Sequence, residues 1–139
     1  MKTVTAQLAA KMNNAGWQPK KSTFWWVRHD SDFKLYYEGQ DIPLPLKEIY
    51  AAPTAEETLE RLPSEIQKDG HYYSISISKT KINHFWIDYR YYSKYRIFHL
   101  KPSDLKADYG IFSLAEAAGK MYIYLKENNL LKEEVGKDQ

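Results

Sequence analysis

The sequence predicts one α+β domain over residues 1–139, with a mostly antiparallel sheet of four to six strands and two or three helices, the last packed on one sheet face. Apolar residues recur at every second position between His71 and Leu100, which is the period of β-strands. Helix start signals stand at Thr54 and Ser113, each followed three residues later by Glu. The 139 residues are 43% hydrophobic and 15% aromatic, which suits a single domain with its own core.

The first element expected along the chain is a short helix from Thr5 to Asn14. Leu8 and Met12 are four residues apart and would therefore share its buried face. Gly16 follows as a helix stop signal, because glycine readily adopts the conformation that ends a helix.

An antiparallel hairpin is expected next. Residues 24–28 and 33–37 are rich in aromatic and other strand-forming side chains, and the polar residues 29–32 between them are typical of a turn. Two prolines then fall within residues 42–50, and proline cannot donate a hydrogen bond to a sheet ladder. We therefore expect residues 42–50 to be an edge strand or an extended connector.

A second helix is expected to begin after Thr54. The Thr54 side chain can accept a hydrogen bond from the amide of Glu57, and the Glu57 side chain can reach back to the amide of Thr54. Pro63 would stop this helix or force a new turn through residues 64–66, because proline lacks the amide hydrogen that a helix interior requires.

The central strands are expected at residues 71–78 and 85–92, with a third run over residues 95–100. Each of the first two runs offers one apolar face for burial. The alternation places Trp86 and Arg90 on the face opposite Tyr89.

The final helix is expected to start at Ser113, where Glu116 repeats the capping-box pattern. Gly119 would allow another element to approach this helix closely. We expect residues 132–139, which are highly charged, to form a frayed tail. Spacings of four, three and four place one apolar stripe against the sheet: Leu114, Ala118, Met121 and Leu125.

Composition excludes several classes of function. The chain has no cysteine, so disulfides, thiolate catalysis and cysteine-ligated zinc are all excluded. Its six glycines are scattered and form no phosphate-binding loop. No apolar run approaches the roughly 18 residues that a membrane span requires. These observations predict a soluble, cytoplasmic protein that uses no cofactor.

Two polar clusters are candidates for a reactive site. His29, Asp30 and Asp32 could hold a metal ion or act in hydrolysis, but a turn stabilised by its own side chains explains this pattern better. His84 and Asp88 share a strand face, as an acid–base pair would, yet four strand residues separate their backbones by roughly 13 Å. We therefore expect Asp88 to be solvent-facing or a cross-strand partner, and we expect no metal site and no enzyme.

Aromatic and basic residues are interleaved between positions 86 and 96. A sheet face of this composition can bind a protein, because Tyr, Trp and Arg are enriched at interface hot spots. It can also stack bases and neutralise phosphates, as proteins that bind single strands do. The candidate binding residues are Trp86, Arg90, Tyr92, Lys94 and Arg96.

Two segments, YAAPTAEETLERLPSEI at 50–66 and SLAEAAGKMYIYLKENNLL at 113–131, resemble segments of small proteins encoded in bacterial prophages and in intestinal Bacteroidetes-type genomes. The likeness covers about a quarter of the chain. It implies a bacterial or phage cytoplasm and an accessory role, and it carries over no activity and no site residue.

The leading hypothesis is a non-enzymatic interaction protein, related to phages or mobile elements, that binds a protein partner through the aromatic–basic sheet surface. The alternative is a small protein that binds single-stranded nucleic acid. Because a basic–aromatic face without a covering helix would expose a large apolar patch, we also expect self-association into a dimer.

Overall fold

The computed structural model describes residues 3–17, 22–81, 84–102 and 113–131. The expected frayed tail, residues 132–139, lies outside the described residues. The elements within them are α1 (Ala6–Asn14), β1 (Phe24–Arg28), β2 (Phe33–Tyr37), β3 (Glu48–Ala51), α2 (Ala55–Arg61), β4 (Glu65–Lys68), β5 (His71–Lys81), β6 (His84–Tyr92), β7 (Ile97–Leu100) and α3 (Leu114–Glu127).

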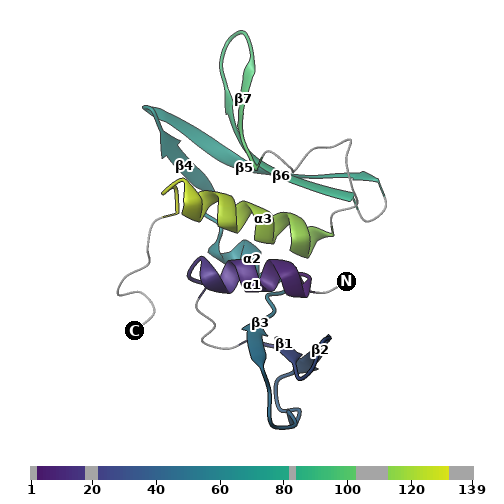
Figure 1. Ribbon diagram of the computed structural model, residues 1–139. Coiled ribbons are helices and arrows are strands. Elements are labelled where there is room, and N and C mark those ends of the chain that lie inside the picture. Colours follow the sequence, from purple (N-terminus) through teal and green to yellow (C-terminus); the bar gives the residue numbers. More distant parts are fainter. Residues whose placement is uncertain (1–2, 18–21, 82–83, 103–112, 132–139) are drawn as a thin grey trace.

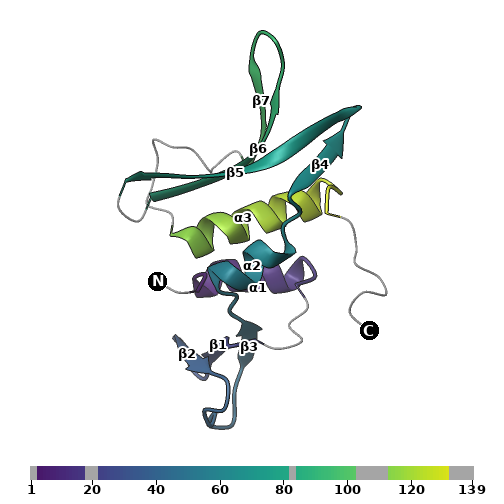
Figure 2. The same ribbon diagram turned by 180° about the vertical axis from the view of Figure 1, so that it is seen from behind.

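The α+β class is confirmed, and the strands of the described residues fall into two antiparallel sheets. The smaller sheet has the order β2-β1-β3, and the larger has the order β4-β5-β6-β7. Figures 1 and 2 show α3 against the larger sheet, α1 and α2 beyond α3, and the smaller sheet on the far side of those two helices. The expected packing of the last helix on a sheet face is therefore confirmed.

Side chains at the helix starts confirm two of the sequence signals and correct a third. Thr54 and Glu57 form the expected capping box, with hydrogen bonds of 2.9 and 3.1 Å. The Ser113 hydroxyl accepts from the Glu116 amide at 3.1 Å, but the Glu116 carboxylate does not return to Ser113. It accepts instead from the amide of Thr5 at 2.9 Å, at the start of α1. Glu116 thus joins the first turns of α1 and α3.

The hairpin of β1 and β2 forms as the sequence predicts, but with β3 it makes a sheet of its own rather than part of one sheet with the central strands. β1 pairs with β2 through the turn at 29–32, and β3 begins only after Pro45 and pairs with the other side of β1. β3 is therefore an edge strand. The Asn13 side chain holds this sheet against α1: its Oδ1 accepts from the amide of Ala51 at 3.2 Å, and its Nδ2 donates to the carbonyl of Ala51 at 3.0 Å.

Of the two outcomes expected at Pro63, the structure shows the first: α2 ends at Arg61, and residues 65 and 66 begin strand β4 instead of a new turn. These residues enter an antiparallel pair with β5, and Ile66 is buried in the core. Asp69 and Gly70 connect the two strands with positive φ angles of 51° and 81°. Positive φ at both central residues is the geometry of a tight two-residue hairpin turn, and Asp-Gly is a preferred sequence for it. Residues 65–68 are too few for a strand to be recognised from their sequence pattern alone, and they form one because they pair with β5.

Strand β7 begins two residues later than the run predicted from residue 95. The turn between β6 and β7 is closed by Ser93, whose amide donates to the carbonyl of Arg96 at 3.0 Å. The Ser93 hydroxyl also accepts from the amides of Tyr95 and Arg96 at 3.3 and 3.2 Å. The resulting β6–β7 hairpin projects away from the helices and beyond the rest of the larger sheet (Figures 1 and 2).

The core lies between the larger sheet and the helices. The side chains of Ile87 and Tyr89 in β6 and of Met121 and Leu125 in α3 are fully buried there. A side chain at Gly119 would lie within 2.9 Å of Leu8 in α1, which confirms the close approach expected at this glycine. α3 is therefore covered by the larger sheet on one side and by α1 and α2 on the other.

Candidate functional site

The candidate surface is the face of the larger sheet that points away from α3. Ile87 and Tyr89 point into the core. Strand alternation therefore directs four other residues of β6 to the opposite side: Trp86, Asp88, Arg90 and Tyr92. We call this side the outer face. The register sets three serines of β5 and one histidine of β7 beside the β6 residues of that face: Ser74, Ser76, Ser78 and His99.

Asp88 lies in the middle of the outer face and is fully buried. Its carboxylate accepts hydrogen bonds from Arg90 Nε at 3.0 and 3.1 Å. Its second oxygen lies 2.6 Å from His99 Nδ1. A buried carboxylate is costly unless it is paired and hydrogen-bonded, and here both conditions are met. The expectation that Asp88 faces solvent is therefore wrong, whereas the cross-strand alternative holds, with His99 as the partner.

His99 was not singled out from the sequence. It pairs with Arg90 across β6 and β7, and that register brings its ring to Asp88, eleven residues away in the chain. No hydrogen bond between described residues joins Asp88 to His84, the partner considered from spacing. A contact made between strands leaves no spacing signal, so only the paired hairpin could have revealed it.

The charge of Arg90 is fixed by its neighbours. A hydrogen bond with the Tyr92 hydroxyl and the nearby Asp88 carboxylate raise the pKa of Arg90 above its ordinary value, against the opposing effect of partial burial. The guanidinium therefore stays charged at any physiological pH, and much of that charge is compensated by Asp88.

Trp86 is covered by a cation. The ammonium group of Lys101 lies 4.0 Å from the centre of the Trp86 ring, which is the geometry of a cation–π contact. The indole Nε1 of Trp86 is buried and has no hydrogen-bond partner among the described residues. Neither Trp86 nor Lys101 is thus fully available to a partner in this arrangement.

The tip of the β6–β7 hairpin, residues 92–97, carries three exposed large apolar side chains. Tyr92, Tyr95 and Ile97 are 63%, 87% and 44% exposed. Lys94 extends over the Tyr95 ring, 5.6 Å from its centre. Arg96 lies over the Phe98 ring at 4.1 Å, and Phe98 contacts Tyr91 of the opposite face. We call residues 92–97 the hairpin tip.

The structure separates the five predicted binding residues into two groups. Trp86 and Arg90 lie in the middle of the outer face, where Lys101 and Asp88 already contact them. The other three belong to the hairpin tip, on the part of the sheet that projects furthest from the helices: Tyr92, Lys94 and Arg96.

The polar turn at residues 29–32 is held by contacts within the protein. His29 Nδ1 lies 3.0 Å from the carbonyl of Pro45, and His29 Nε2 lies 3.4 Å from the Tyr36 hydroxyl. Arg28 donates to the carbonyl of Asp30 at 2.7 Å. Among the described residues no group of three His, Asp or Glu side chains is placed to hold a metal ion. The side chains of Arg28 and His29 therefore hold this turn, whereas none of the hydrogen bonds found among the described residues involves the side chains of Asp30, Ser31 or Asp32.

Comparison with known protein families, with curated proteins and with solved structures finds no match to this chain. The resemblance to prophage-encoded proteins stays a prediction. Within the part of the chain that the structure describes, no helix has the length and apolar character needed to cross a membrane.

Proposed function

We propose that this protein is a non-enzymatic interaction protein that binds an acidic, partly apolar segment of a protein partner at the hairpin tip. The observation that carries the proposal is the exposure of Tyr92, Tyr95 and Ile97 at the end of a projecting hairpin. Large apolar side chains gathered on one exposed element are typical of interaction sites.

The charge of the hairpin supports an acidic partner. The hairpin tip, residues 92–97, contains Lys94 and Arg96 and no Asp or Glu. Complementary charge speeds association and rejects partners of the wrong sign. Tyr and Arg are also the residues that most often supply binding energy at protein interfaces. The resemblance to phage-encoded proteins would place this binding in a bacterial cytoplasm.

Single-stranded nucleic acid is the second candidate, because Tyr92 and Tyr95 are exposed beside Lys94 and could stack on bases. The engagement of the other cations argues for a protein partner instead. Arg90 is bound to Asp88, and Lys101 lies over Trp86, so both would have to give up existing contacts to neutralise phosphates.

Selection of random peptides displayed on phage would test the proposal. The wild-type protein and a Tyr95→Ala variant would serve as bait, with Tyr37→Ala as a matched control, since Tyr37 is a 58% exposed tyrosine on the smaller sheet. We expect the wild type and Tyr37→Ala to enrich peptides that combine Asp or Glu with apolar residues, and Tyr95→Ala to enrich none. Equal enrichment by all three proteins would refute binding at the tip.

Titration of labelled single-stranded oligonucleotides, at low and then at physiological salt, separates the two candidates. We expect weak binding that salt abolishes and that Tyr92→Ala leaves unchanged, because incidental basic charge binds phosphate only through counterion release. A base-stacking tip would behave differently, since Tyr92→Ala would then cost roughly 1–3 kcal/mol of binding free energy. Tight binding that Tyr92→Ala abolishes would overturn the ranking.

A further inference from the structure

Strand β7 is an edge of the larger sheet, because among the described residues it pairs with β6 and with no other strand. An edge strand presents a row of backbone amide and carbonyl groups that the sheet itself does not pair. The hydrogen-bond pattern of the β6–β7 hairpin determines which residues of β7 present these groups.

The unpaired backbone groups belong to Ile97 and His99. The Ser93 amide donates to the carbonyl of Arg96 at 3.0 Å, so these two residues form a hydrogen-bonded pair. Hydrogen-bonded and non-hydrogen-bonded pairs alternate along an antiparallel ladder. The pair that follows, at Ile97, is therefore non-hydrogen-bonded, and the same holds two residues further on, at His99. The amide and carbonyl groups of both residues consequently point away from β6, toward the free edge.

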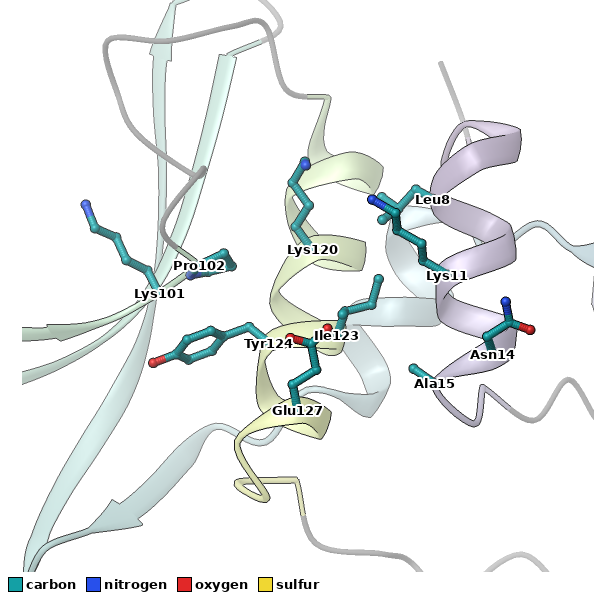
Figure 3. Close-up of a pocket in the computed structure, with 10 residues that line it drawn as sticks. All are labelled: Leu8, Lys11, Asn14, Ala15, Lys101, Pro102, Lys120, Ile123, Tyr124 and Glu127. Atoms are coloured by element: carbon teal, nitrogen blue, oxygen red, sulfur yellow. The ribbon is translucent and has the colours of Figure 1, made fainter.

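The accessible part of this edge lies next to the hairpin tip. Ile97 and His99 are exposed, and no backbone hydrogen bond found among the described residues joins either of them to another segment. Pro102, by contrast, is buried and lies between the end of β7 and α3, where it lines the groove that Figure 3 shows. A strand added to β7 would therefore lie along residues 97–99.

We propose that the partner segment binds in extended form and adds to β7 as a further strand of the larger sheet. This inference rests on the proposed function and goes further by naming the conformation of the partner and its backbone contacts. Peptides that add to a sheet edge gain affinity from main-chain hydrogen bonds, whereas their alternate side chains provide specificity.

Strand alternation predicts the side-chain pattern of the added segment. On the outer face, an apolar side chain would cover Ile97, which is 44% exposed. On the opposite face, an acidic side chain would lie near the exposed guanidinium of Arg96, which contacts the Phe98 ring. No ion pair between described residues neutralises Arg96. The segment should therefore alternate apolar and acidic residues, and a second copy of β7 does not fit because it contains no acid.

Hydrogen exchange of backbone amides, followed by nuclear magnetic resonance, tests strand addition with a short peptide of alternating Glu and Val. We expect saturating peptide to slow exchange of the Ile97 and His99 amides roughly tenfold or more, because each amide would donate to the peptide. A peptide of alternating Lys and Val should slow neither. Unchanged exchange at both amides, up to millimolar Glu-Val peptide, would overturn the proposal.

Two further outcomes separate the added strand from its alternatives. Peptide binding that Tyr95→Ala abolishes, but that leaves the Ile97 and His99 amides unprotected, would keep the tip as the binding site and remove the added strand. Slow exchange of these amides in the absence of peptide, when the protein self-associates, would place a second copy on β7 and overturn the assignment to a foreign segment.

Methylation of every backbone amide of the Glu-Val peptide tests the main-chain contacts from the side of the ligand. The methylated peptide keeps its side chains and charge but has no donors for β7. We expect it to bind roughly tenfold more weakly or worse. Equal binding by the two peptides would overturn the proposal.

Ile97→Pro tests the same contacts from the side of the protein. Because the Ile97 amide is not used in the β6–β7 ladder, proline is compatible with this edge position. We expect Ile97→Pro to weaken Glu-Val peptide binding roughly tenfold. Ile97→Val is the matched control, since valine keeps the amide and an apolar side chain, and it should bind as the wild type does. Protection of the Phe98 amide, which the alternation assigns to β6, verifies that the hairpin has formed. Equal binding by the two variants would contradict the added strand.

Discussion

At Asp88, a carboxylate that is 0% exposed depends on Arg90 and His99 for all of its observed side-chain hydrogen bonds. The sequence predicts a solvent-facing Asp88 because this polar residue alternates with the apolar Ile87 and Tyr89. Its burial arises from the register of β7, which sets His99 beside it. Strand alternation could therefore predict the face on which Asp88 lies but not its environment.

We expect Asp88→Asn to lower the free energy of unfolding by about 1–3 kcal/mol, because the neutral amide cannot replace a charged acceptor for Arg90 and His99. Urea unfolding measures this. Asp30→Asn, which changes an exposed acid in the 29–32 turn, should remain within about 0.5 kcal/mol of the wild type. If both variants unfold at the wild-type midpoint, the cluster around Asp88 contributes nothing to stability.

The hydroxyl of Tyr89 is a second buried titratable group, and it donates to the carbonyl of Pro63 at 2.6 Å. Burial raises the pKa of Tyr89 above its ordinary value of 10.0, and burial likewise raises the pKa values of Tyr122 and Tyr124. Above about pH 10 the unfolded chain therefore loses protons that the folded protein keeps. Stability should be unaffected by these groups below that pH and should fall as the pH rises through it.

This alkaline loss is measured by urea unfolding at neutral pH and above pH 10. We expect Tyr89→Phe to be less stable than the wild type by about 1 kcal/mol at neutral pH, through the lost hydrogen bond. It should then lose less stability than the wild type on going to alkaline pH, because one raised pKa has been removed. An equal alkaline loss in the two proteins would show that Tyr89 ionises as easily when folded as when unfolded.

At the level of single elements, the apolar stripe predicted for α3 makes a testable contribution to stability. Leu125 and Met121 of α3 are fully buried in the core. We expect Leu125→Ala to lower the free energy of unfolding by about 2–5 kcal/mol, and Ser113→Ala by about 1 kcal/mol through loss of the cap. Denaturant melts decide this: a wild-type midpoint for Leu125→Ala would contradict the packing of α3.

Glu116 differs from an ordinary capping residue because its carboxylate contacts the start of another helix, α1, and this difference can be tested. Because Glu116 accepts from the amide of Thr5, Glu116→Ala should speed hydrogen exchange of the amides in the first turn of α1. Glu57→Ala is the matched control, since Glu57 caps its own helix, α2, and should leave exchange in α1 unchanged. Equal protection of α1 in both variants would mean that the Glu116 contact does not hold in solution.

Elements with a strong local signal were predictable. The hairpin of β1 and β2, the start of α2 and the stripe of α3 all follow from patterns within a few residues. β4 was missed because its four residues contain one apolar side chain, Ile66, and become a strand only by pairing with β5. The division into two sheets and the contact between Asp88 and His99 likewise depend on partners distant in the sequence, so no local pattern encodes them.

At the scale of the whole molecule, the helices bury one face of the larger sheet and the hairpin tip projects beyond them (Figure 1). Exposed apolar side chains at such a place favour association. We expect a dimer at micromolar concentration, measured by sedimentation. A concentration-independent species of 16.4 kDa would rule out self-association and leave a foreign protein as the partner of the tip.

The hydrogen bond between Thr5 and Glu116 spans 111 residues of chain, and Gly119 meets Leu8 across a similar distance in sequence. On the ribosome, α1 would therefore emerge long before Glu116 and the α3 residues that cover its apolar face. A contact of such long range must close a large loop before it contributes stability, which slows folding. α1 would thus dock against α3 only late in synthesis, and the nascent chain would expose Leu8 and Met12 to chaperones until α3 has been made.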